Sequence, residues 1–177
     1  MPTFVLAALI LQVAAMDDPA ARHETCLRLV GENAELAYEE ALTWRHQGGG
    51  WPAEHCVSLA LIALDQAEAG AARLRAAAEG AITATDASRA IMFGQAGDGF
   101  LTAEAPGEAR AAFERGLDFA PSDSGLQRGA AQAALALEDY AGAERAASAA
   151  LSSAAAPSGR ADALRLRALA RLMLGRP

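Results

Sequence analysis

Residues 109–121 read ARAAFERGLDFAP, and the order of small, aromatic and proline residues in this stretch decides the fold. On a helix, residues three or four apart share one face, so Ala109, Phe113 and Gly116 form a single stripe. Small residues in the stripe let a paired helix approach closely, and Phe113 fills the gap between that pair and the next unit. Pro121 cannot continue the helix, which must end just before it. The stretch therefore predicts a helix and its stop.

The composition agrees with an all-helical protein. Of the 177 residues, 53% are hydrophobic but only 5% are aromatic, so the apolar fraction is mainly alanine and leucine. Both residues are strong helix formers, and the β-branched residues that favour strands are sparse. The length suffices for one domain or one short repeat array with a buried core. We expect closely packed, alanine-lined helices.

The stripe recurs further along the chain. Three pairs of positions are each separated by 34 residues: Ala109 with Ala143, Phe113 with Ala147, and Gly116 with Ala150. With the same shift of 34 residues, Pro121 aligns with Ala155, and Pro157 follows two residues later. Residues 64–78 repeat the pattern less faithfully. A period of 34 residues, each unit a pair of antiparallel helices, is the signature of the tetratricopeptide repeat.

At these positions the chain resembles the tetratricopeptide repeat family. Matching residues occur at Gly97, Ala109, Phe113, Gly116 and Pro121 in residues 90–123, and at Ala131, Tyr140, Ala143 and Ala150 in residues 124–157. Both units lack the family's tryptophan, and Pro106 and Ala147 stand where aromatics are expected. The resemblance covers residues 51–177 well and residues 18–50 faintly. It implies an α-solenoid, which is a stack of helix pairs.

We expect about four helix pairs and one closing helix. The predicted helices span residues 19–30, 34–47, 52–64, 66–80, 86–103, 107–119, 124–137, 140–154 and 159–174. A degenerate pair (18–50) precedes the repeats of 51–157, which divide into 51–84, 90–123 and 124–157. Candidate helix caps are Asn33, Asp65, Asp139, Ser158 and one of residues 122–124. The closing helix (158–177) should turn Leu164, Leu169 and Leu172 inward and its arginines outward, and so shield the end of the stack.

The amino terminus resembles a secretory signal. An unbroken apolar run spans residues 4–11, and Val13 and Ala15 are small residues placed ahead of a possible cut. The run is too short to span a bilayer, and a positively charged start is missing. We predict that residues 1–15 are a cleaved signal peptide of a bacterial periplasmic protein, with no stable membrane insertion afterwards. The alternative is a packed first helix in a cytoplasmic protein.

The charge excludes a nucleic-acid partner. The formal net charge is −7, whereas phosphate binding depends on a surplus of lysine and arginine. The distribution is uneven: residues 158–177 carry five arginines against Asp162, for a net +4, and residues 1–157 hold 10 basic and 21 acidic residues, for a net −11. The basic closing helix could mark an interaction surface, although a solvated outer face is our interpretation.

The two cysteines suggest a disulfide. If the first three predicted helices alternate in direction, Cys26 and Cys56 lie on parallel helices at similar heights. In an oxidising compartment they could close a loop of about 30 residues and stabilise the degenerate pair. The alternatives are two buried thiols, or a zinc site that adds His23 and His55. Adjacent residues point about 100° apart on a helix, so His55 and Cys56 cannot easily share a metal.

No catalytic motif appears in the sequence. It contains no glycine-rich phosphate loop, and no histidine–carboxylate grouping rises above chance. Adjacent carboxylates at Asp17-Asp18 and Glu39-Glu40 face different ways on a helix and fit a solvated surface. We therefore expect a non-catalytic protein without a cofactor.

The family resemblance implies a partner groove on the concave side, lined by the first helix of each pair. The corresponding positions here are His55, Leu59, Ile62, Ile91, Gly94, Asp98, Leu101, Gly125, Arg128, Gln132 and Leu135. Such grooves bind an extended segment or a helix of another protein. We expect a scaffold or adaptor of the cell envelope that binds a protein or peptide. The partner's identity and the oligomeric state do not follow from the sequence.

Overall fold

The computed structural model describes residues 18–176, which form nine α-helices joined by short turns. They are α2 (Pro19–Glu32), α3 (Ala34–His46), α4 (Gly50–Ala63), α5 (Ala67–Gly80), α6 (Asp86–Thr102), α7 (Pro106–Phe119), α8 (Ser124–Ala136), α9 (Tyr140–Ser153) and α10 (Pro157–Met173). The bounds differ from the predicted ones by no more than two residues. The predicted signal peptide, residues 1–15, lies outside the described part of the chain.

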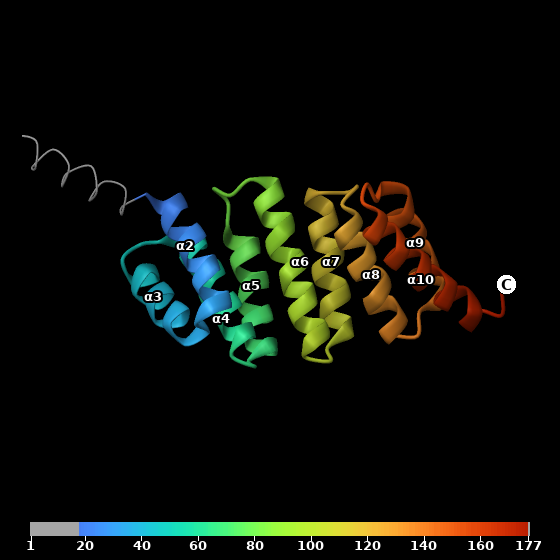
Figure 1. Cartoon of the computed structure of the whole chain (residues 1–177), viewed down its shortest axis with the longest axis horizontal. Coiled ribbons are helices and arrows are strands. Elements are labelled where there is room, and N and C mark those ends of the chain that lie inside the picture. The colour runs from blue at the N-terminus through green and yellow to red at the C-terminus, as the bar shows by residue number, and fades with distance from the viewer. Residues whose placement is uncertain (1–17, 177) are drawn as a thin grey trace, which may run out of the picture.

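The helices stack in chain order as antiparallel pairs, so that the molecule is a helical solenoid of four pairs closed by α10 (Figure 1). Each helix packs on the next one in the chain. The first helices of neighbouring pairs also touch, as α2 does with α4, α6 with α8, and α8 with α10. This arrangement confirms the predicted all-α architecture. No helix in the described ranges is long and apolar enough to cross a membrane.

Polar side chains cap three of the helices as the sequence suggests. Asn33, Asp123 and Asp139 accept hydrogen bonds from backbone N–H groups in the first turns of α3, α8 and α9, at 3.1, 2.9 and 2.9 Å. Two predicted caps are wrong. Asp65 lies in the turn before α5 with a φ of 60°, and the residue that precedes the helix is Gln66. Ser158 lies inside α10, because that helix already begins at Pro157, where a missing N–H is tolerated.

The 34-residue period corresponds to equivalent buried positions. All six members of the aligned stripes are buried: Ala109, Phe113 and Gly116 on α7, and Ala143, Ala147 and Ala150 on α9. Phe113 lies between two glycines of other helices. A Cβ atom added to Gly97 of α6 or to Gly129 of α8 would overlap with the Phe113 ring. Phe113 therefore fills the space between its own pair and the next, as predicted.

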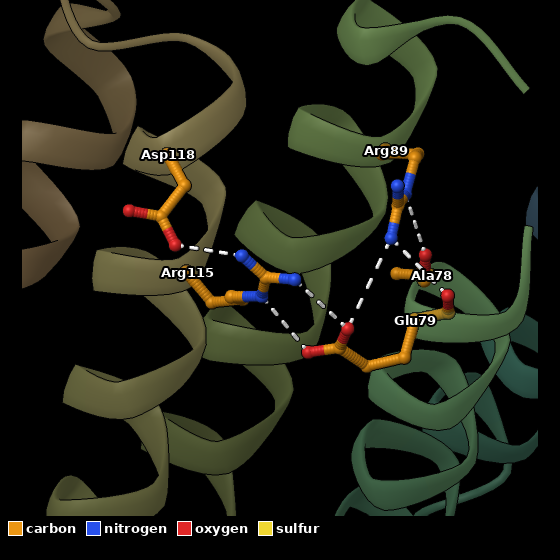
Figure 2. Close-up of polar contacts among 5 residues, drawn as sticks. All are labelled: Ala78, Glu79, Arg89, Arg115 and Asp118. Carbon is orange, nitrogen blue, oxygen red and sulfur yellow. Dashed lines mark hydrogen bonds and ion pairs between the residues drawn. The ribbon is translucent and has the colours of Figure 1, made fainter. Parts of the chain in front are cut away.

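Two arginines join α5, α6 and α7. Figure 2 shows their polar contacts, and both also lie against one aromatic ring. Arg89 of α6 donates to the carbonyl groups of Ala78 and Glu79 at 2.9 and 3.1 Å, which satisfies acceptors at the end of α5. Arg115 of α7 donates to both carboxylate oxygens of Glu79 at 3.0 and 3.2 Å. Both guanidinium groups also lie over the ring of Phe119, at 4.2 and 4.9 Å. These contacts fix the three helices relative to one another.

The closing helix presents the opposite face to the one predicted. Its buried residues are Ala163, Leu166 and Ala170, whereas Leu164, Leu169 and Leu172 are 46%, 46% and 73% exposed. The alanine-rich face packs on α8 and α9 because small residues allow closer approach of the helix backbones. The leucines are left on the side away from the stack. Helix α10 does close the end of the stack, but the prediction that these three leucines face inward is wrong.

Candidate partner-binding site

A hollow of about 230 Å³ lies between α6 and α8, the first helices of two consecutive pairs. Of the predicted groove positions, six line it: Ile91, Gly94 and Asp98 from α6, and Gly125, Arg128 and Gln132 from α8. The structure thus brings together residues that are far apart in the chain. The two helices that supply them belong to the third and fourth helix pairs of the solenoid.

Glycines form part of the wall of the hollow. Gly94, Gly125 and Gly129 all line it, and a Cβ atom added at these positions would meet Leu126, Asp123 and Phe113, respectively. Phe113 also lines it, held between α6 and α8 as described above. Ile91 also lines the hollow, and its apolar side chain is 57% exposed. The wall therefore offers an apolar contact next to polar groups.

The polar side chains that line the hollow are the carboxylates of Asp98 and Asp123, the guanidinium of Arg128 and the amides of Gln95 and Gln132. The surrounding protein desolvates Asp98 and raises the pKa of its carboxyl, an effect that the nearby charge of Arg128 opposes. Arg128 also lies 3.8 Å from Asp162 of α10, between Nη1 and Oδ2. Gln95 and Gln132 supply amide donors and acceptors. Such a surface can hydrogen-bond a peptide backbone and pair with a charge of either sign.

The other predicted groove residues lie elsewhere. Leu59, Ile62 and Leu101 are half-buried and pack against the central core. Leu135 is half-buried against smaller clusters beside α9 and α10. His55 is only 4% exposed. The continuous hollow is therefore shorter than the predicted groove, and the role of these five residues as partner contacts stays a prediction.

His55 belongs to a chain of hydrogen bonds that crosses three first helices. Its Nε2 lies 2.7 Å from Oε1 of Gln95 on α6, and its Nδ1 lies 3.0 Å from Nε2 of His23 on α2. An amide oxygen only accepts, so His55 donates from Nε2 and accepts at Nδ1 from the Nε2–H of His23. Sequence reasoning missed Gln95, because a glutamine on a helix carries no spacing signal of its own. Gln95 also lines the hollow, so this chain of hydrogen bonds reaches the candidate site.

Burial and geometry hold the histidines of this hydrogen-bond chain in the neutral form. The pKa of His55 is lowered to about 4: burial is the main cause, the hydrogen bond to Gln95 opposes the shift, and the nearby His23 adds to it. Burial also lowers the pKa of His23. A proton added to Nδ1 of His55 would face the Nε2–H of His23 with no acceptor between them. The geometry and the burial therefore both exclude the charged, doubly protonated form of His55 near neutral pH.

The two cysteines meet as predicted. Cys26 of α2 and Cys56 of α4 lie at disulfide distance, with their Cα atoms 6.2 Å apart and 30 residues between them in sequence. Both are buried, in a small core with Ala41, Val57 and Leu61. The sulfur atoms pair with each other and the imidazoles of His23 and His55 pair separately. Within residues 18–176, no three His, Cys, Asp or Glu side chains are arranged to hold a metal ion.

No protein-family model matches this chain, and no match was found among curated proteins or solved structures. The all-helical stack of sequential pairs is consistent with a helical repeat. The candidate site is thus defined by its own geometry: a hollow across two repeats, an exposed isoleucine, and a small set of convergent polar groups.

Proposed function

We propose that this protein is a non-catalytic adaptor that binds a peptide or helix of another protein in the hollow between α6 and α8. The convergence of Ile91, Asp98, Arg128 and Gln132 from two consecutive helix pairs is the observation that carries the proposal. Stacked helix pairs create extended concave surfaces, and proteins of this architecture use them for binding. The resemblance to tetratricopeptide repeats, read from the 34-residue period, supports the same function.

We place this adaptor in the envelope of a bacterium, exported by residues 1–15. The pairing of Cys26 with Cys56 supports an oxidising compartment, because disulfides persist there and are rare in the cytosol. The competing proposal is a cytoplasmic adaptor with two reduced thiols. Mass spectrometry of the protein from its native host separates the two. The exported form lacks the first residues and gains the mass of two hydrogen atoms on reduction.

The hollow is tested by capture from envelope extracts with a double variant, Ile91→Glu and Arg128→Glu. The exposed Ile91 and the partly exposed Arg128 can be changed without opening the core. Leu101 is a poorer probe because it packs against the core, so that an acidic residue there would also destabilise the fold. We expect the double variant to lose its partners, since it replaces an apolar contact and reverses the charge of the wall.

The matched control is Ile82→Glu with Arg145→Glu. Ile82 is 87% exposed in the turn between α5 and α6, and Arg145 is exposed on α9, so both lie outside the hollow. This variant carries the same chemical changes and should retain every partner. Equal capture by the two variants, both with native circular dichroism, would show that binding does not use the hollow.

A further inference from the structure

The face that α10 turns away from the stack carries half of the exposed large apolar side chains in the described part of the chain. Eight such side chains occur among residues 18–176, and four of them are on α10: Leu164, Leu169, Leu172 and Met173. Leu164, Ala168 and Leu172 are spaced four residues apart and line one shallow hollow on that helix. In the part of the chain that the structure describes, no helix covers this face.

Arginines border the apolar stripe. Arg167, Arg171 and Arg176 line the same hollow. Arg171 and Arg176 approach the carboxylate of Glu144 at 3.7 and 2.8 Å, whereas Arg167 has no ion pair or hydrogen bond with any described residue. Arg165 is 74% exposed and reaches only Asp162, at 3.9 Å. The end of the stack at α10 is therefore apolar at its centre and positively charged around it.

The other end of the stack has the opposite charge. Figure 1 shows α3 at one end of the row of helices and α10 at the other. The exposed residues of α3 include Glu35, Glu39 and Glu40, none of which forms an ion pair with a described residue, and Leu36, which is 41% exposed. Leu36 is the one exposed large apolar side chain of the described part of this end. An unpaired acidic surface with an apolar residue thus faces away from the stack at α3.

We propose that copies of this chain associate head to tail, with α10 of one copy docking on α3 of the next. The unpaired carboxylates of α3 would meet Arg165 and Arg167, and Leu36 would contact the leucines of α10. Complementary charge favours this arrangement over pairing of two α10 helices, which would bring arginines together. Because the two surfaces differ, a docked pair still has one free α3 end and one free α10 end. The contact can therefore repeat to form a chain of copies.

The test uses charge reversal at each end of the full-length chain. One variant carries Arg165→Glu and Arg167→Glu; the other carries Glu39→Arg and Glu40→Arg. The control carries the same charge change as the second variant, at Glu68→Arg and Glu114→Arg, on the exposed surfaces of α5 and α7. Light scattering would give the weight-average mass from about 5 μM to about 500 μM protein, a range suited to a weak contact. Circular dichroism would check that each variant folds.

We expect the mass of the wild type and of the control to rise with concentration and to fall as salt screens the charges. Each end variant alone should remain monomeric, because both of its ends then carry the same sign. An equimolar mixture of the two end variants should associate again, since each supplies the charge that the other lacks. This rescue depends on the ends alone and is independent of partner binding in the α6–α8 hollow.

Three results would overturn the proposal. The first is a wild type that stays monomeric over the whole range, whether or not it binds vesicles of anionic lipid through α10. The second is a mass that stops at twice the monomer and is unaffected by reversal at α3, as expected for two α10 helices packed together. The third is failure of the mixed end variants to associate when both are folded and the wild type does associate.

Discussion

At the scale of single residues, the packing of this protein depends on glycines, whose lack of a side chain lets neighbouring groups approach closely. Gly97 and Gly129 leave the space that the Phe113 ring occupies, and Gly70 lets α5 approach the backbone of α4 at Ser58 and Ile62. Interiors are packed as tightly as organic crystals, so one added methyl group at such a contact must displace its neighbours. This explains why a chain with few aromatic residues still forms a dense core.

We expect Gly129→Ala to lower the free energy of unfolding by about 1–3 kcal/mol, the usual cost of overpacking a core. The matched control is Gly107→Ala, because a Cβ at Gly107 of α7 meets no atom within 4 Å. That substitution should stabilise the protein by about 0.5–1 kcal/mol, since alanine is the better helix former. Denaturant unfolding measures both. Similar effects of the two substitutions would contradict the account of Phe113 packing.

The lowered pKa of His55 makes stability depend on pH. Its pKa is about 4 in the folded protein against 6.5 when unfolded, so the folded state holds the neutral ring. Its contribution is fully present above pH 6.5 and is lost as the pH falls toward 4. By linkage, the loss at the acid end amounts to about 3 kcal/mol. Carboxylates titrate in the lower part of the same range, so a variant must isolate the histidine.

The variant His55→Gln keeps an amide in the hydrogen-bond chain but cannot titrate. We expect its free energy of unfolding to vary less than that of the wild type between pH 6.5 and pH 4, when both are measured by denaturant titration. The variant can be less stable at neutral pH without affecting this comparison. Parallel pH profiles for the two proteins would show that His55 does not cause the acid sensitivity.

At the scale of helices, we expect a disulfide between Cys26 and Cys56, which lie at disulfide distance, to stabilise the amino-terminal pair. Its core has five buried residues, and the central core that includes Phe93, Phe100 and Phe113 has many more. Closing a loop of 30 residues in the unfolded chain is worth about 3–4 kcal/mol in the chain-entropy model. We therefore expect the disulfide to offset a weak hydrophobic core where the repeat pattern is also weakest.

We expect the double variant Cys26→Ala and Cys56→Ala to unfold at a lower temperature than the oxidised wild type, consistent with a loss of about 3–4 kcal/mol. Calorimetry with and without reductant tests this. Reductant should lower the melting temperature of the wild type and leave that of the double variant unchanged. A wild type that is insensitive to reductant after full unfolding and refolding would mean that the two sulfurs are not bonded.

At the scale of the whole molecule, stability should vary along the stack. In a solenoid each unit contacts only its neighbours, so each region is as stable as its own interfaces. Phenylalanine and leucine fill the centre, whereas the three clusters beneath α9 and α10 are mainly alanine. Less apolar area is buried per residue at that end, which means less stabilisation.

Hydrogen exchange measured by mass spectrometry tests this distribution. Backbone amides of α9 and α10 should exchange through local opening well before those of α6 and α7. The experiment is done at low protein concentration, so that association of copies does not protect α10. Uniform protection from α4 to α10 would show that the stack unfolds as one cooperative unit and that the alanine-rich end is not weaker.

The sequence by itself determined the helices and their order, and it predicted that Cys26 and Cys56 lie close together. Proline, glycine and capping residues act within one turn of the chain, and the 34-residue period repeats the small residues that face a neighbouring helix. Helix direction then placed Cys26 beside Cys56. The sequence also predicted six of the residues that meet in the hollow: Ile91, Gly94, Asp98, Gly125, Arg128 and Gln132.

Only the tertiary structure decided which faces remain open. It showed that His55 is buried against His23 and Gln95, that three predicted groove residues pack on the central core, and that α10 turns its leucines outward. The physical reason is that a helix bearing apolar residues on two sides gives no local signal of which side is covered. That choice depends on how closely backbones approach, and here the alanine face of α10 approached most closely.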